Sequence, residues 1–164
     1  MNPVTVTASI ARPQEEVFDY LADIANLPEF TDHFLTDWRL TREDPVGTGA
    51  GARFRIEAPL NRFSWSDLTY AEVERPWRIV ARGRGGKMNR IRALVTLNLS
   101  QASKGVTKVE WTWETVPAKP SDRFMEMFAG TGWWKRRMSR GARRLRTILE
   151  EDRGRGTRVT VAGG

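Results

Sequence analysis

The chain has few side chains that could take part in catalysis, and Asp67 is the strongest candidate among them. It lies in the segment FSWSDLTYAEVERP, where residues alternate with the period of a β-strand. This alternation predicts that Asp67 lies between Trp65 and Thr69 on the inner face, where burial raises the pKa of a carboxyl group. Such a group can act as a general acid or base, or can anchor a ligand. A register shifted by one residue would turn Asp67 to solvent and Tyr70 inward, so Tyr70 is the second candidate.

The other polar motifs indicate structure rather than chemistry. His33, the single histidine, stands in TDHF and is interpreted as a surface or capping residue. The chain has no cysteine, so a typical transition-metal site with nitrogen and sulfur ligands is not expected. The segment GRGGK (83–87) lacks the spacing of a Walker phosphate loop and is predicted to form a hairpin turn. We therefore expect neither a metal ion nor another cofactor.

An antiparallel β structure must position most of these residues. From Asp37 to about Pro117, several segments alternate between apolar and more polar residues, and short turns with glycine or proline separate them. Each segment has one mainly apolar face, as an antiparallel sheet requires when its other side faces water. The segment VTVTASI (4–10) alternates in the same way and predicts an earlier strand. We expect six or seven strands in a meander.

Helices are predicted before and after these strands. The segment PQEEVFDYLADI (13–24) begins with a proline and two glutamates suited to a first helical turn, and its apolar residues have helical spacing. The following ANLPEFTDHF (25–34) predicts a short second helix or an ordered turn. From Ser121 to about Glu151 the apolar residues form one continuous stripe, which predicts a long amphipathic helix interrupted at residues 130–132.

This order of elements and three segments resemble a known superfamily. ARPQEEVFDYLADIANLPEF (11–30), VERPWRIVARGRGG (73–86) and RRLRTILEE (143–151) resemble the SRPBCC, or START-like, superfamily, in particular its polyketide cyclase/dehydrase and lipid-transport branch. The resemblance covers about residues 3–152 and implies an α+β helix-grip fold. In that fold a curved antiparallel sheet of six to seven strands wraps around a long C-terminal helix, with one or two short helices after the first strand.

The resemblance also implies a cavity between the sheet and the C-terminal helix. Seven tryptophans are many for one small domain, which supports a roomy cavity. Gly130 and Gly132, opposite large aromatic residues, are expected to leave volume unfilled. The other interpretation is that the aromatic residues form ordinary core. The residues expected to line the cavity are Phe30, Phe34, Phe54, Ile56, Trp65, Asp67, Val95, Leu97, Trp111, Trp113, Phe124, Phe128 and Trp134.

Two classes of function are compatible with such a cavity. The first is the binding or transport of a hydrophobic small molecule, such as a lipid, a polyketide or an isoprenoid. The second is a polyketide cyclase or dehydratase type of enzyme, in which Asp67, Tyr70 or an arginine moves protons without a metal ion. An inward-facing ionisable pair would favour the enzyme, whereas a wholly apolar lining would favour the carrier.

Length and composition restrict the organisation of the chain. With 164 residues, of which 40% are hydrophobic, we expect a single domain (1–152) followed by a flexible basic tail (153–164). The absence of cysteine indicates a reducing compartment. The sequence has neither the apolar region of a signal peptide nor a run long enough to span a membrane, so we expect a soluble, cytoplasmic protein.

The positive charge is concentrated towards one end of the chain. Between Trp133 and Arg158 ten basic residues stand against three acidic ones, and this excess equals the net charge of +7 of the whole chain. Most of these cations lie off the apolar stripe of the predicted helix. They form either an ordinary solvated face or a weak contact with an anionic membrane through Arg136, Arg140 and Arg143. Nucleic-acid binding is not expected, because the aromatic residues lie on the opposite face.

Overall fold

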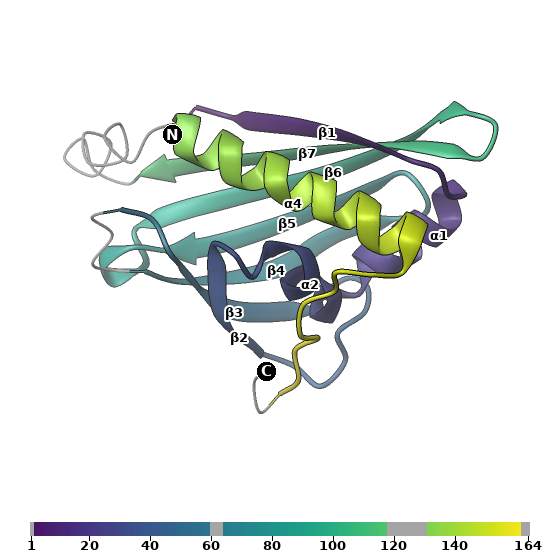
Figure 1. Ribbon diagram of the computed structural model, residues 1–164. Coiled ribbons are helices and arrows are strands. Elements are labelled where there is room, and N and C mark those ends of the chain that lie inside the picture. The colour runs from purple at the N-terminus through teal and green to yellow at the C-terminus, as the bar shows by residue number, and fades with distance from the viewer. Residues whose placement is uncertain (1, 60–63, 118–130, 162–164) are drawn as a thin grey trace.

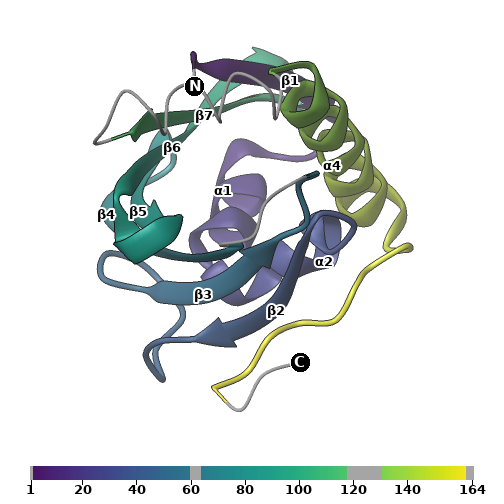
Figure 2. The same ribbon diagram turned by 90° about the vertical axis from the view of Figure 1, so that its left-hand side faces the viewer.

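A seven-stranded antiparallel sheet dominates the computed structural model, which describes residues 2–59, 64–117 and 131–161. The strands are β1 (Val4–Ile10), β2 (Leu35–Leu40), β3 (Gly51–Ile56), β4 (Trp65–Glu74), β5 (Arg78–Gly85), β6 (Ile91–Ser103) and β7 (Val106–Pro117). Their order in the sheet is β1-β7-β6-β5-β4-β3-β2, so β2 to β7 form a meander and β1 returns to pair with β7. Figure 2 shows that the sheet curls into an open half-barrel.

The helices that follow β1 and the long C-terminal helix lie on the concave side and at the open side of this half-barrel. Between β1 and β2 are α1 (Gln14–Ala22), the short 3₁₀ turn η1 (Ile24–Asn26) and α2 (Leu27–Thr31), and η2 (Lys87–Asn89) joins β5 to β6. The long helix α4 (Thr131–Glu151) crosses the concave face in Figure 1. Figure 2 shows α4 closing the half-barrel between β1 and α2. The predicted α+β helix-grip fold is confirmed.

The helix α4 packs through the apolar stripe seen in the sequence. Its buried residues recur at three- and four-residue spacings, as a helix with one buried face requires. They are Trp134, Met138, Gly141, Ala142, Leu145, Ile148 and Leu149. The predicted beginning of this helix at Ser121 lies outside the described residues.

Glycine allows α4 to approach the sheet closely at one position. A Cβ atom at Gly141 would lie 3.1 Å from the Trp111 ring and 3.3 Å from the carbonyl oxygen of Phe30. By contrast, Gly132 is exposed, and a Cβ atom there would meet no described residue within 4 Å. The expectation that Gly132 lies opposite large aromatic residues is therefore wrong, because it sits on the outer side of α4. Gly130 lies outside the described residues.

The C-terminal segment, residues 153–161, packs against the domain. Val159 is only 2% exposed, and its N–H donates to the carbonyl of Ala25 at 3.2 Å. The N–H of Gly156 donates to the carbonyl of Glu29 at 2.9 Å. In Figure 1 the segment runs from the end of α4 past α2 towards β2. The expectation of an unpacked tail is therefore wrong for the described part of this segment.

Candidate functional site

The interior between the concave face of the sheet and the helices is apolar and nearly filled. A cavity of about 20 Å³ remains between the described residues, which is room for roughly one water molecule. Its lining comes from α2 and from five strands. The lining residues are Leu27, Phe30, Thr31, Leu35, Trp38, Leu68, Tyr70, Ile79, Ala81, Val95, Leu97, Trp111 and Trp113. This cavity is smaller than the roomy one expected from the sequence.

Aromatic rings occupy much of the space between this cavity and α4. Trp113 of β7 stacks on Trp134 of α4 with ring centroids 4.8 Å apart. Phe54 of β3 meets Trp113 edge-on at 6.4 Å, and Phe34 meets Trp134 edge-on at 5.9 Å. Such aromatic pairs each contribute roughly 0.5–1.5 kcal/mol beyond the burial of their area. The rings thus join the sheet to α4 and leave little empty volume.

Most of the residues expected to line a cavity do face the interior. Those that border the small cavity are Phe30, Val95, Leu97, Trp111 and Trp113. Those that are buried or partly buried in the surrounding core are Phe34, Phe54, Trp134 and Ile56. Phe124 and Phe128 lie outside the described residues. That these side chains contact a ligand stays a prediction.

Trp65 and Asp67 face outward, so the prediction that they point into the interior is wrong. Trp65 is 39% exposed, and the guanidinium groups of Arg53 and Arg55 lie over its ring at 5.3 and 5.9 Å. The carboxylate of Asp67 forms an ion pair of 3.4 Å with Arg53, and both side chains are about half exposed. Asp67 is therefore a solvated surface carboxylate paired with an arginine.

A β-bulge explains why the residues of β4 that face inward differ from the predicted ones. The pairing of β4 with β5 shifts between Tyr70 and Glu72. Before the shift Leu68 and Tyr70 face inward and are buried, whereas after it Val73 packs against the core. The prediction from the sequence assumed that every second residue before Val73 faces inward as Val73 does. Because a bulge changes which residues face inward, no single alternation describes β4.

Tyr70 is the candidate proton carrier that does reach the interior. Its ring is buried, and its hydroxyl donates to the carbonyl oxygen of Leu21 at 2.7 Å. Burial raises the pKa of this phenol, and the charge of Asp23 raises it further. A phenol that keeps its proton and donates a hydrogen bond to the main chain stabilises the fold. It is not free to exchange a proton with a ligand.

Sequence reasoning missed the contribution of β2 and β5 to the cavity. Leu35 and Trp38 of β2 border it, although they are three residues apart and so do not alternate. The pairing of β2 with β3 is irregular between Thr36 and Arg39, which brings both side chains inward. For β5, the alternating positions Ile79 and Ala81 carry the sequence signal of an inward face.

His33 and Arg144 connect α4 to the loop after α2. The Nε2 of His33 lies 3.0 Å from the carbonyl oxygen of Arg137, and its Nδ1 lies 3.3 Å from Nη1 of Arg144. A carbonyl only accepts and a guanidinium only donates, so both contacts require a neutral ring with its proton on Nε2. Burial lowers the pKa of His33, and the charges of Arg140 and Arg144 lower it further. Arg144 also pairs with Asp32.

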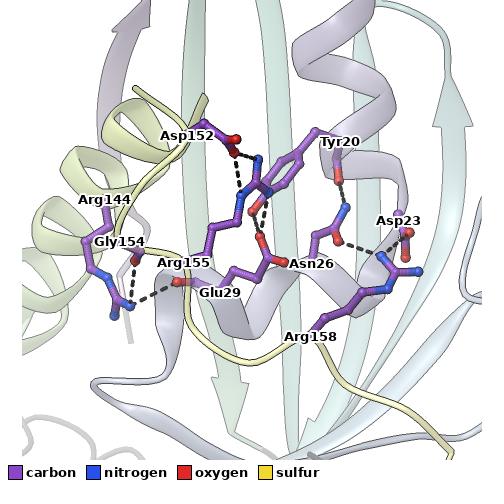
Figure 3. A network of polar contacts seen from close by, with 9 residues as sticks. All are labelled: Tyr20, Asp23, Asn26, Glu29, Arg144, Asp152, Gly154, Arg155 and Arg158. Carbon is purple, nitrogen blue, oxygen red and sulfur yellow. Dashed lines mark hydrogen bonds and ion pairs between the residues drawn. The ribbon is translucent and has the colours of Figure 1, made fainter. Parts of the chain in front are cut away.

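Figure 3 shows how arginines of the C-terminal segment meet carboxylates near α2. Arg155 donates to the carboxylate of Glu29 at 3.0 Å, and the hydroxyl of Tyr20 donates to the same carboxylate at 2.6 Å. Arg158 donates to the carboxylate of Asp23 at 2.6 Å. The side chain of Glu29 is only 8% exposed. A buried carboxylate without a partner is strongly destabilising, so Arg155 compensates a charge that the fold has buried.

The outer side of α4 carries four exposed cations with no carboxylate partner among the described residues. This group, the cationic face, consists of Lys135, Arg136, Arg140 and Arg143. Two surface hollows of about 430 and 620 Å³ adjoin it, and both are bordered by Lys135, Ser139 and Arg143. The other arginines of the helix are engaged. Arg137 lies over the ring of Trp133, Arg144 pairs with Asp32, and Arg146 pairs with Glu150.

Neither a metal centre nor a membrane-spanning helix is found in the described ranges of the chain. Within residues 2–59, 64–117 and 131–161, no group of three or more histidine, aspartate or glutamate side chains is placed to hold a metal ion. None of the helices described there is both long and apolar enough to cross a membrane.

The curled sheet, the helix α4 and the apolar interior define a START-like helix-grip protein. Comparison with family models gives the particular family, because residues 1–150 match the one described as "Polyketide cyclase / dehydrase and lipid transport". The chain belongs to this family, as the resemblance in the sequence indicated. No curated protein matches the sequence.

Several solved structures share this fold at low sequence identity. The solution structure of KanY has a TM-score of 0.70 and 14% identity, and the match covers 90% of this chain and 96% of KanY. Truncated norcoclaurine synthase from Thalictrum flavum has a TM-score of 0.68 and 12% identity, and the match covers 92% of this chain and 94% of the synthase. DynU16, a protein in the dynemicin biosynthetic locus, has a TM-score of 0.63 and 18% identity, and the match covers 95% of this chain but 50% of DynU16. At these identities the likeness shows the fold alone.

Proposed function

We propose that the protein binds or carries a hydrophobic small molecule, such as a lipid, a polyketide or an isoprenoid, between the sheet and α4. The observation that carries this proposal is the apolar, aromatic interior described above. Thr31, Trp38 and Tyr70 border its cavity, but the hydroxyls of Thr31 and Tyr70 and the indole N–H of Trp38 each donate to a main-chain carbonyl. Transfer of an apolar molecule into such a space gains about 25 cal/mol per Å² removed from water. The family description, which includes lipid transport, supports the same function.

Binding requires part of this interior to open. Small-molecule pockets in proteins enclose roughly 300–1,000 Å³, whereas the cavity between the described residues has about 20 Å³. The shortest element around the cavity is α2, which contributes Leu27, Phe30 and Thr31 to the lining. On its outer side Arg144 and Arg155 hold it through hydrogen bonds to Glu29. We expect α2 to be the wall that moves when a ligand enters.

A cyclase or dehydratase activity is the alternative function, and the described interior supports it less. Asp67 lies on the outer face of the sheet, and the hydroxyl of Tyr70 is committed to the carbonyl of Leu21. The name of norcoclaurine synthase indicates that this fold can host an enzyme. The cavity lining described here has no ionisable pair that could move protons, which favours binding over catalysis.

Quenching of tryptophan fluorescence by a dibrominated stearate tests the proposed function. Bromine quenches tryptophan on contact, so a ligand in the interior would quench Trp111, Trp113 and Trp134 saturably. The exposed Trp65 and Trp77 are first replaced by phenylalanine to remove their emission. We expect saturable quenching that persists in this variant and weakens when Trp113→Ala or Trp134→Ala is added. Absence of saturable quenching by the stearate and by an aromatic polyketide would contradict the proposal.

We also propose that the cationic face makes a weak contact with anionic membranes. Its members Arg136, Arg140 and Arg143 are free of carboxylate partners in the described structure. The part of α4 that the structure describes has no exposed large apolar residue. An interface with another protein usually needs such an anchor, whereas a bilayer surface attracts by charge without a complementary shape. Each basic residue near an anionic membrane contributes about 1 kcal/mol.

Co-sedimentation with vesicles of phosphatidylcholine, with and without phosphatidylserine, tests this contact. We expect binding only to the anionic vesicles, lost at about 0.5 M salt because of screening. The double substitution Arg136→Glu with Arg143→Glu should remove the binding to anionic vesicles. The matched control, Arg78→Glu with Arg92→Glu on exposed positions of β5 and β6, makes the same change of charge and should retain it. Binding to neutral vesicles, or no binding at low salt, would contradict the proposal.

A further inference from the structure

One polar atom in the apolar interior is left without a partner. The Nε1–H of Trp113 is buried and has no hydrogen-bond acceptor in the part of the chain that the structure describes. An indole N–H can only donate, and buried donors are nearly always paired because an unpaired one loses its hydration without compensation. Trp113 itself is 2% exposed, so bulk water does not supply the missing acceptor.

The tryptophan that carries this unpaired donor is part of the candidate site. Trp113 borders the small cavity and stacks on Trp134 of α4. On the sheet its neighbours across β1 and β6 are Val4 and Val95, neither of which offers a side-chain acceptor. A molecule that enters between the sheet and α4 would therefore meet the Trp113 ring.

A second tryptophan on the same lining shows what a purely structural indole looks like. Trp38 borders the same cavity, and its Nε1–H donates to the carbonyl of Leu35 at 2.9 Å. Tyr70, also on the lining, donates to the carbonyl of Leu21. The fold has thus satisfied these two donors internally and has left that of Trp113 free.

The lining also restricts the charge of the missing acceptor. Among the described residues, none that borders the cavity is a lysine, arginine, aspartate or glutamate. A carboxylate or phosphate placed there would lose its hydration without gaining a counter-charge, which is strongly unfavourable. The acceptor that suits this position is therefore a neutral oxygen.

We infer that the molecule bound in the interior carries a neutral oxygen acceptor, such as a ketone, ester, ether or hydroxyl, which receives the Nε1–H of Trp113. This inference rests on the proposed function, and it narrows the ligand class. A pure hydrocarbon leaves the donor unpaired, and a charged head group is excluded from this end of the site. Trp113 acts as the residue that selects oxygenated ligands.

Two planar probes of nearly the same shape, fluorene and its ketone fluorenone, test the inference by titration. The measured quantity is the ratio of the two dissociation constants, fluorene over fluorenone. Because the ketone oxygen of fluorenone pairs with the buried N–H, we expect fluorenone to bind about five- to tenfold more tightly than fluorene. Trp113→Phe should abolish that preference. Trp38→Phe is the matched control, because it makes the same change of volume but removes an N–H that is already paired. Because Trp38 also lines the cavity, its replacement changes both dissociation constants but should leave their ratio unchanged.

The outcomes separate this inference from the proposed function. If both probes bind with a ratio that Trp113→Phe does not change, the inference is wrong although the interior still binds apolar molecules. If neither probe binds, the proposed function is contradicted and the inference with it. The indole N–H resonance of wild-type Trp113 provides a check that needs no stable variant. It should move to the frequency of a hydrogen-bonded indole with fluorenone but not with fluorene, and equal shifts with both probes would overturn the inference.

Discussion

Two arginine-rich regions follow one another in the sequence, yet they differ in what they contact. On α4, the cationic face faces solvent without a carboxylate partner among the described residues. In the C-terminal segment, Arg155 and Arg158 pair with Glu29 and Asp23. The first group is available to an external anion, whereas the second completes the fold. A basic run therefore acquires its role from where the acidic residues lie in space.

Burial explains why these pairs matter more than ordinary surface ion pairs. The side chains of Glu29 and Asp23 are 8% and 14% exposed, so water screens them poorly. An exposed ion pair contributes about 0–1 kcal/mol, but the loss of a partner from a buried charge costs several times more. The C-terminal segment should therefore affect stability, and the cationic face should not.

The largest effect is expected from removal of the C-terminal segment. Deletion of residues 153–164 exposes the pocket of Val159 and leaves Glu29 and Asp23 without their arginines. We expect a loss of about 3 kcal/mol, which is a fall in melting temperature of roughly 10 °C for a domain of this size. Thermal unfolding followed by circular dichroism measures it, with deletion of residues 162–164 as the control. An unchanged melting temperature would mean that the segment does not stabilise the domain.

A single substitution should reproduce part of this loss. Arg155→Ala removes the guanidinium from Glu29, and because Arg155 is itself 40% exposed we expect about 1–2 kcal/mol of destabilisation. Glu29→Gln keeps an acceptor for the Tyr20 hydroxyl but removes the charge. The double variant should therefore lose less stability than the sum of the two single losses. Urea unfolding of the wild type, the two single variants and the double variant measures this difference. Strict additivity would show that the two charges do not interact.

Charge reversal on the cationic face should leave stability almost unchanged. Arg136→Glu with Arg143→Glu alters only solvent-facing side chains, so we expect a change within about 0.5 kcal/mol per residue. The same urea experiment measures it beside Arg155→Ala. A loss as large as that of Arg155→Ala would remove the distinction between the two regions.

The smallest effect concerns His33, which lies between the two regions. Its pKa is lowered by burial and by Arg140 and Arg144, so the unfolded chain binds a proton more readily than the folded protein. His33 therefore favours folding above the pKa of about 6.5 of an unfolded histidine, and this contribution falls as the pH drops below that value. His33→Gln should flatten the dependence of stability on pH between about 7.5 and 5.5. Identical slopes for the variant and the wild type would contradict the lowered pKa of His33.

The sequence predicted the fold and much of the site where local patterns were regular. Along β6 and β7 the alternation runs without a shift through Val95, Leu97, Trp111 and Trp113, and all four face inward as predicted. The amphipathic stripe placed α4 on the sheet with its cations outward. Patterns of this kind are local, since the period of a strand or helix alone decides which side chains share a face.

The tertiary structure alone decided what depends on partners distant in the sequence. The bulge beside Tyr70 exists only in the pairing of β4 with β5, and it turned Asp67 to solvent. Glu29 and Arg155 are 126 positions apart, so no local pattern could show that the tail is packed. The unpaired N–H of Trp113 is visible only once every neighbouring side chain is in place. Periodicity determines which face is buried, whereas hydrogen bonds and ion pairs are fixed only when the whole chain has folded.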